Sequence, residues 1–152
     1  LEIREPMFLR PCSDLKTFAG LVITPAALAE WQQQVRAIAD DFATLTPETL
    51  VLAAPLKEIQ AEYRFFVVAG QVVTGSQYKL GNRVRTAPGC HPAALELAQT
   101  AARHWSPACA FVLDVALTET GPFILEINCL TSAGFYEAEV GRLVDALEGR
   151  FG

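Results

Sequence analysis

The chain is poor in charged residues, and its acidic residues outnumber its basic ones. Asp, Glu, Lys and Arg make up 19% of the sequence, and the formal net charge is −5 at pH 7. Proteins that bind nucleic acid by neutralising phosphates carry a surplus of basic residues, so this composition predicts no nucleic-acid partner. Apolar runs fall well short of the roughly 18 residues that span a membrane, and no signal peptide is visible, so we expect no membrane partner.

The chain has four cysteines, Cys12, Cys90, Cys109 and Cys129. No two of the four cysteines stand at C-x-x-C spacing, which argues against a zinc ribbon. Cys109 adjoins a strongly apolar run, where a buried and reduced thiol is expected. This usage of cysteine fits a reducing, cytoplasmic setting. The sequence starts at Leu1 rather than at a methionine, which leaves open whether it is a piece of a longer protein.

The chain contains enough apolar residues to form a folded core. It has 152 residues, of which 51% are hydrophobic, sufficient for one domain or for two small lobes that share a cleft. Period-two and helical patterns predict strands over 7–10, 21–23, 50–54, 62–68, 71–78, 109–117 and 123–128, and helices over 25–43, 92–105 and 137–148. We expect a basic loop over 79–90. Strand pairs flanked by helices predict an α+β fold with a largely antiparallel sheet.

The most informative segment is the predicted hairpin FVLDVALTETGPFILEIN, residues 111–128. A turn centred on Thr120 would place Asp114 opposite Glu126, and directly opposed residues point to the same side of a sheet. Asn128 would be the next residue on that face, and Ile124 is also expected there. Three oxygen-bearing side chains would therefore converge within two otherwise apolar strands.

Two carboxylates this close repel each other and lose hydration, so a cation is needed to offset the charge. Carboxylate and amide oxygens suit magnesium, which takes its remaining ligands from water and substrate phosphates. We therefore predict that Asp114, Glu126 and Asn128 hold Mg²⁺ and that a nucleotide completes the site. The alternative is that Asp114 and Glu126 pair with arginines on an exposed sheet face.

The order of motifs along the chain resembles that of the ATP-grasp superfamily. The acid-bearing strand, the strand that ends in E-I-N and the small-residue loop after it resemble the metal hairpin of that superfamily. The segments FLRP, KTFAG and EYRFFVVAGQVVTGSQYK look like a clade of small prokaryotic and phage members marked by two arginines and a lysine. The resemblance covers about residues 7 to 136.

The resemblance implies a single ATP-grasp domain over 1–152, built of two small α+β lobes, approximately 1–50 and 51–152, with the ATP cleft between them. It also implies an enzyme, an ATP- and Mg²⁺-dependent carboxylate–amine or carboxylate–thiol ligase that works through an acylphosphate. Its substrates would be a carboxylate and an amine, small molecules or peptides. The substrate-binding domain that usually precedes the grasp is not in the sequence, and a homodimer is left open.

The resemblance assigns nucleotide contacts to the first part of the chain. Arg10 would contact phosphate, and Lys16 with the loop to Gly20 would cover the phosphates. Lys57 would end a hinge over 52–57 near the adenine. The hinge strand LVLAAP carries no acid, unlike many superfamily members, and the loop over 11–20 has a single glycine, so both depart from the family pattern.

The remaining assignments fall on the predicted strands over 62–78 and the residue that follows them. Glu62 would face the ribose or the phosphate region, while Arg64 and Lys79 would bind the γ-phosphate or the acylphosphate as catalytic groups. The residues alone also permit simpler roles, in which Arg64 pairs with Glu62, Arg10 lies on the surface and Lys79 is solvated. The corresponding alternatives for the whole chain are a nucleotide-binding module without catalysis, or a kinase that stops at phosphoryl transfer.

Overall fold

The computed structural model describes residues 1–13, 17–38 and 44–152. It consists of two compact units, Leu1–Lys57 and Glu58–Gly152, each with its own sheet and its own helical cover. Both sheets are antiparallel, which confirms the predicted α+β class. Among the helices of the described residues, none combines the length and the hydrophobicity that a membrane-spanning helix needs.

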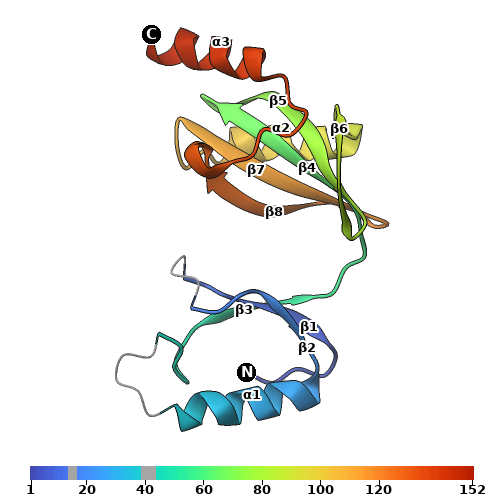
Figure 1. Ribbon diagram of the computed structural model, residues 1–152, viewed down its shortest axis with the longest axis vertical. Helices are drawn as coiled ribbons and strands as arrows, with labels where there is room; N and C mark the ends of the chain where they lie inside the picture. Colours follow the sequence, from blue (N-terminus) through green and yellow to red (C-terminus); the bar gives the residue numbers. More distant parts are fainter. Residues whose placement is uncertain (14–16, 39–43) are drawn as a thin grey trace. The chain divides into compact units, whose positions relative to one another are not determined.

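The first unit is a three-stranded sheet with one helix along it (Figure 1). Its strands are β1 (Met7–Pro11), β2 (Leu21–Ile23) and β3 (Val51–Pro55), in the order β2-β1-β3. Helix α1 (Pro25–Ala37) starts as its sequence predicts, because the Thr24 hydroxyl accepts a hydrogen bond from the backbone N–H of Ala27 and Pro25 occupies the first turn.

Helix α1 is shorter than the period predicts. It ends at Ala37, and Ile38 is already extended with ψ 110°. The rest of the predicted helix, over 39–43, lies outside the described residues. The apolar stripe of α1 still packs on the sheet, since Leu28 is buried with Leu9 and Ile23 in the core of this unit.

The second unit is built around a five-stranded sheet of order β6-β5-β4-β7-β8. Its strands are β4 (Ile59–Val68), β5 (Gln71–Leu80), β6 (Arg83–Pro88), β7 (Ala110–Thr118) and β8 (Gly121–Cys129). The predicted tight turn between β4 and β5 is confirmed: Ala69 and Gly70 both have positive φ, 51° and 76°. Two such residues in succession are what a type I′ hairpin turn requires.

The predicted loop over 79–90 is wrong. Strand β5 continues to Leu80 and turns through Gly81 (φ 55°) into β6, which pairs with β5 through Lys79 and Val84. The basic composition of this segment hid the strand, because β6 is an edge strand whose side chains are largely exposed. Gly81-Asn82 is itself a two-residue hairpin signal between strands.

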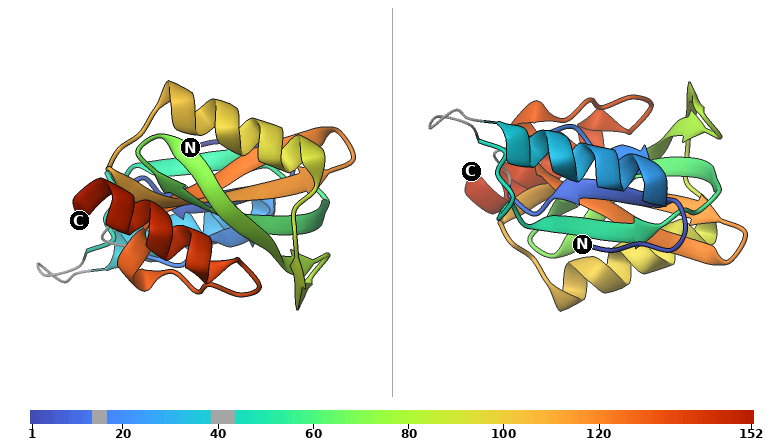
Figure 2. Two further views of the ribbon diagram at one scale, coloured as in Figure 1. Left: turned by 90° about the horizontal axis from the view of Figure 1, so that it is seen from above. Right: turned by 90° about the horizontal axis from the view of Figure 1, so that it is seen from below.

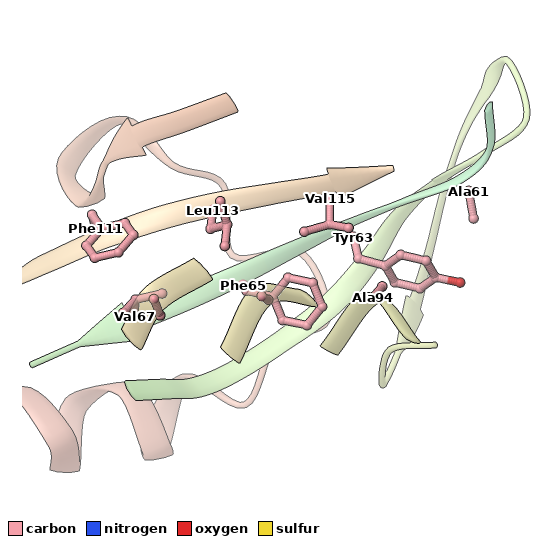
Figure 3. Packing of buried hydrophobic residues seen from close by; sticks show 10 residues of the cluster. Ala61, Tyr63, Phe65, Val67, Ala94, Phe111, Leu113 and Val115 are labelled. Carbon is pink, nitrogen blue, oxygen red and sulfur yellow. The ribbon is translucent and has the colours of Figure 1, made fainter. Parts of the chain in front are cut away.

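Helices cover the two faces of this sheet, as the left view of Figure 2 shows. Helix α2 (Pro92–His104) packs its alanines on one face, against residues that alternate along β4 and β7. Figure 3 shows this layer, with Tyr63, Phe65 and Val67 from β4 beside Phe111, Leu113 and Val115 from β7. The predicted bounds of α2 are confirmed to within a residue.

Helix α3 (Val140–Phe151) packs on the opposite face, near one end of the strands. It begins three residues later than predicted, after the single-turn helix η1 (Leu130–Ser132) and an irregular segment over 133–139. Its partners in the core are Phe66, Val68 and Val112, from the even-numbered positions of β4 and β7. Because side chains alternate between faces, Glu62, Arg64 and Asp114 lie on this same face, farther along the strands.

Candidate active site

We call the face of the second sheet that carries Glu62, Arg64 and Asp114 the charged face. At its centre is an ion pair between two neighbouring strands. Arg64 on β4 stands opposite Asp114 on β7 in the sheet register. The guanidinium donates from Nε to Oδ1 at 2.8 Å and from Nη2 to Oδ2 at 2.7 Å, a bidentate geometry. Asp114 is only 1% exposed and the Arg64 side chain 11%. The partner of Arg64 is thus Asp114, which corrects the alternative in which Glu62 held it.

The alternative in which Asp114 and Glu126 pair with arginines on an exposed face is right about the arginine of Asp114 and wrong about the exposure of Asp114; among the described residues no arginine pairs with Glu126. The buried carboxylate of Asp114 lies on β7 between Val112 and Ala116, which are fully or almost fully buried. Burial disfavours the ionised form and is the main cause of the raised pKa of Asp114; the hydrogen bond from Arg64 opposes that rise, and the charge of Glu126 adds to it. The same hydrogen bond raises the pKa of Arg64, so this cation keeps its charge.

Strand β8 brings the other two predicted metal ligands beside Asp114. Glu126 stands opposite Asp114 and Asn128 opposite Val112, as predicted. The hairpin turn, however, contains only Glu119 and Thr120, and the register is restored by an irregularity between positions 114 and 115.

That irregularity is a bulge with Leu125 as the extra residue of β8, since Asp114 pairs with Glu126 and Val115 with Ile124. The bulge places Ile124 on the opposite face of the sheet from the one predicted. This side chain lines an apolar pocket with Leu113 and Trp105 on the α2 face, so the prediction that Ile124 shares the face of Asp114 is wrong.

Glu62 is the second buried carboxylate of the charged face, and it binds two side chains of β5. Its Oε1 accepts a 2.6 Å hydrogen bond from Nζ of Lys79, and its Oε2 accepts one from the hydroxyl of Tyr78. Glu62 is buried, whereas the Lys79 side chain remains 33% exposed. The simpler reading of Lys79 as merely solvated is therefore wrong, because the side chain is tied to the charged face.

A bulge in β5 explains how two successive residues reach one carboxylate. Glu62 pairs with Lys79 and Tyr63 with Gln77, which leaves Tyr78 as the extra residue. The register of β5 with β6 shifts at the same point. In a regular strand Tyr78 and Lys79 would face opposite sides, so the bulge is what re-aims one of them.

Two tyrosines lie beside the Arg64 guanidinium. The rings of Tyr78 and Tyr136 stack with centroids 5.2 Å apart and planes 15° apart. The central carbon of the guanidinium lies 5.4 Å from the first centroid and 5.3 Å from the second, within cation–π range of both. Neither tyrosine was predicted. Tyr78 was hidden by its bulge, and Tyr136 by the irregular segment in which it lies.

The donor set suits magnesium in kind and number. In the ranges 1–13, 17–38 and 44–152 no three His, Cys, Asp or Glu side chains are grouped closely enough to hold a metal among themselves. Asp114, Glu126 and Asn128 offer two carboxylates and one amide, and Mg²⁺ is commonly held by one or two carboxylates plus phosphate oxygens. Each Asp114 oxygen accepts one bond from Arg64 and retains a lone pair, while Glu126 is exposed to solvent.

The predicted contacts of the first unit are placed as follows. Arg10 lies half-buried on β1, opposite Leu52 of β3. Lys57 is exposed at the last position of the unit. Lys16 lies outside the described residues. The six other predicted site residues all belong to the second unit, on strands β4, β5, β7 and β8.

The fold of the chain resembles solved ATP-grasp structures. The ligase PsnB in complex with a minimal precursor superposes with a TM-score of 0.61 at 16% identity, over 97% of this chain and 48% of that one. PsnB with a phosphomimetic variant of the minimal precursor, Mg and ADP gives 0.55 at 18% identity, over 95% and 45%. PsnB with precursor peptide PsnA2 and AMPPNP gives 0.54 at 17% identity, over 95% and 45%. The chain thus spans about half the length of these structures.

Sequence comparison gives the more specific result. No curated protein matches the chain. A family model for an ATP-grasp domain, the second family of the clade named for two arginines and a lysine, matches residues 2–146, which is nearly the whole chain. The predicted resemblance is confirmed by this match: the chain belongs to the second family of the two-arginine, one-lysine clade of ATP-grasp domains.

Proposed function

We propose that this chain binds Mg-ATP and catalyses ATP-dependent ligation of a carboxylate to an amine, through an acylphosphate. The observation that carries the proposal is the charged face of the second unit, where Arg64, Asp114 and Glu126 lie at paired positions on three neighbouring strands of the sheet, β4, β7 and β8. Membership of an ATP-grasp family indicates that the nucleotide is ATP, and a protein of the same fold has been solved with Mg and ADP. A thiol in place of the amine would use the same site.

The metal would be held by Asp114, Glu126 and Asn128. Its contribution when bound is to neutralise charge on the nucleotide phosphates. Arg64 supports this arrangement in two ways. Its ion pair with Asp114 fixes the carboxylate in place. The pair also keeps the summed charge of Arg64, Asp114 and Glu126 at −1 rather than −2, so that a phosphate-bearing ligand is repelled less.

Cations for the transferring phosphoryl group remain available after these pairings. The bonds to Asp114 use Nε and Nη2 of Arg64, and Nη1 has no hydrogen-bond partner among the described residues. Lys79 gives one of its three ammonium protons to Glu62, which leaves two donors. We assign both side chains to the transferring phosphoryl group, where fixed donors stabilise developing charge. Arg10, Lys16 and Lys57 are proposed to add nucleotide contacts from the first unit.

The reaction that this face would support has two steps. An oxygen of the substrate carboxylate attacks the γ-phosphorus of ATP, the bond from that phosphorus to the β–γ bridging oxygen breaks, and ADP leaves. The amine nitrogen then attacks the acyl carbon, the acyl carbon–oxygen bond breaks, and phosphate leaves with that oxygen while the nitrogen gives up a proton. No side-chain nucleophile is needed, and none is assigned.

A peptide is the carboxylate substrate that we favour. Structures of the same fold were solved with a precursor peptide and with a phosphomimetic variant of a minimal precursor together with Mg and ADP. A phosphomimetic substrate bound together with Mg and ADP is the combination expected if the substrate itself is phosphorylated during the reaction. An aspartate or glutamate side chain within a peptide would present the required carboxylate.

Hydroxylamine trapping tests the proposal and separates its alternatives. The chain is incubated with Mg-ATP, hydroxylamine and peptides that contain Asp or Glu, or with small carboxylic acids, and ADP and hydroxamate are measured. A hydroxamate together with ADP shows that an acylphosphate forms, and an amide product on replacing hydroxylamine by an amine shows ligation. A trapped acylphosphate without any amide would indicate a kinase. Nucleotide binding without ADP release from any carboxylate would leave only a binding module.

A further inference from the structure

We propose that Tyr136 is a positioning residue for Arg64, and that its ring sets the orientation of the guanidinium that meets the phosphoryl group. The inference rests on the proposed function for its kinetic consequences, but not for its geometry. The ring lies 5.3 Å from the central carbon of the guanidinium, on a segment that follows the metal-site strand β8.

Three groups form a nearly equilateral cluster. The distances between the Tyr78 ring, the Tyr136 ring and the guanidinium carbon are 5.2, 5.3 and 5.4 Å. Asp114 fixes the guanidinium along one edge, through Nε and Nη2. The rings restrict the remaining motion, the swing of the guanidinium plane about that edge, because a cation is attracted to the ring electrons. Asp114 and the tyrosines together therefore hold Nη1 in one direction.

Tyr78 is itself held, so it can serve as the base of the cluster. Its hydroxyl donates to Glu62, which also binds Lys79, and the β5 bulge gives its backbone a fixed course. Tyr136 has no such bond: among the described residues its hydroxyl has no hydrogen-bond partner, so what it contributes is its ring. A phenylalanine at this position would supply the same ring.

The backbone at Tyr136 is shaped to present that ring. Its φ is +49°, in the left-handed region that residues other than glycine seldom occupy. The ring also lies against Gly134, where a Cβ would come within 3.4 Å of Cζ of Tyr136. A residue held in such a conformation persists only when its surroundings fix it, and such residues concentrate at functional sites.

The segment around Tyr136 is fastened to the sheet at both sides of the ring. Phe135 stacks on Phe66 at 5.6 Å between centroids. Farther on, the backbone N–H of Glu139 donates to the hydroxyl of Thr74 at 3.0 Å. Phe135 thus offers a matched control: it is the neighbouring residue, it is about as exposed as Tyr136, at 44% and 43%, and its ring stacks on Phe66, whereas the cation–π contacts of Arg64 in the described part of the chain are with Tyr78 and Tyr136.

The test compares Tyr136→Asn, Tyr136→Phe and Phe135→Leu. Asparagine tolerates positive φ, so the first variant removes the ring without adding backbone strain. The direct readout is ¹⁵N relaxation of the Arg64 Nε–H in the chain without ligand. We expect its order parameter to fall in Tyr136→Asn and to stay at the wild-type value in the other two variants. An unchanged order parameter in Tyr136→Asn, or an equal fall in Phe135→Leu, would overturn the proposal.

The kinetic readout depends on the proposed reaction. In ADP release with a responsive carboxylate, Tyr136→Asn should lower kcat by about tenfold, the order expected from losing a cation–π contact to a partly buried guanidinium. The KM for ATP should change little, and Tyr136→Phe should restore kcat. If no carboxylate elicits ADP release from the wild type, the proposed function fails while the relaxation result still decides the role of Tyr136. Loss of order without loss of kcat would confine that role to structure and overturn its kinetic part.

Discussion

The ion pair between Arg64 and Asp114 leads to the sharpest prediction about stability. In Asp114→Asn the side chain keeps its shape but loses its charge and one acceptor. Its amide nitrogen is then directed at either Nε or Nη2 of Arg64, so that donor faces donor. Arg64 is left as a cation in a site where its side chain is 11% exposed.

The size of the effect follows from the burial of both partners. Removing one partner of a buried ion pair costs about 3–5 kcal/mol, mostly from leaving the other charge uncompensated. Residual exposure of Arg64 allows some hydration, so we expect Asp114→Asn to lower the free energy of unfolding of the second unit by about 3 kcal/mol. Arg64→Met should be at least as harmful, because Asp114 is only 1% exposed.

The double variant separates an ion pair from simple loss of packing. Arg64→Met with Asp114→Asn leaves no buried charge, and replacing such a pair by neutral groups is often close to neutral. We therefore expect the double variant to be more stable than either single variant. Urea unfolding measures this, with Trp31→Phe as the common background so that Trp105 alone reports on the second unit. A loss below about 1 kcal/mol for Asp114→Asn, or additive losses in the double variant, would show that Arg64 and Asp114 do not act as a buried ion pair.

Three further predictions follow from single positions. Arg64→Ala should lower kcat for ADP release by about 10²-fold or more and Arg64→Lys should rescue it poorly, because an ammonium cannot reproduce the bidentate fork; a normal kcat in steady-state assays would remove Arg64 from the reaction. Burial raises the pKa of the Cys90 thiol to about 11, so its alkylation at pH 8 should be slower than that of exposed Cys12 and should accelerate toward pH 11; peptide mapping after timed iodoacetamide treatment checks this. By the same sign, Cys90 stabilises the fold below its ordinary pKa and that stability is lost as pH rises through about 11. Gly75→Ala should destabilise the fold, since its Cβ would come 2.8 Å from the backbone oxygen of Arg64, whereas Gly149→Ala in helix α3 meets open space and should stabilise by roughly 0.5 kcal/mol in urea unfolding.

Much of the fold could be predicted from the sequence because its signals are local. Helix α2 and the turn at Ala69-Gly70 follow from a proline start, an apolar period and a two-residue turn. Strand β6 could not be found by its pattern, because an edge strand with exposed side chains has no apolar alternation. The end of α1 at Ala37 lies inside an unbroken apolar period, so nothing local marks it.

Two β-bulges in the candidate site could not be predicted from the sequence pattern. The pairing of Asp114 with Glu126 was predicted from a turn centred on Thr120, but the real turn is one residue shorter, and the extra residue Leu125 restores the match. A second bulge at Tyr78 placed an aromatic ring beside Arg64. Both bulges lie within hairpins, β4–β5 and β7–β8, where one strand carries an extra residue that strict alternation cannot foresee.

The metal ligands themselves can be tested without disturbing the ion pair. Glu126 is exposed, and within the described part of the chain it has neither a hydrogen bond nor an ion pair. Glu126→Gln should therefore leave the unfolding free energy within about 0.5 kcal/mol of wild type, as surface substitutions usually do. It removes one of the two carboxylates proposed to hold Mg²⁺, which makes it a cleaner probe than Asp114→Asn.

The decisive measurement of the proposed Mg-ATP site is calorimetric titration of the chain and of Glu126→Gln with AMPPNP, in the presence and absence of Mg²⁺. We expect wild type to bind the nucleotide in a Mg²⁺-dependent manner, and we expect Glu126→Gln to retain its fold but to lose that dependence together with most of the affinity. Equal Mg²⁺-dependent affinity in the two proteins, or binding that is indifferent to Mg²⁺, would contradict the proposed metal site.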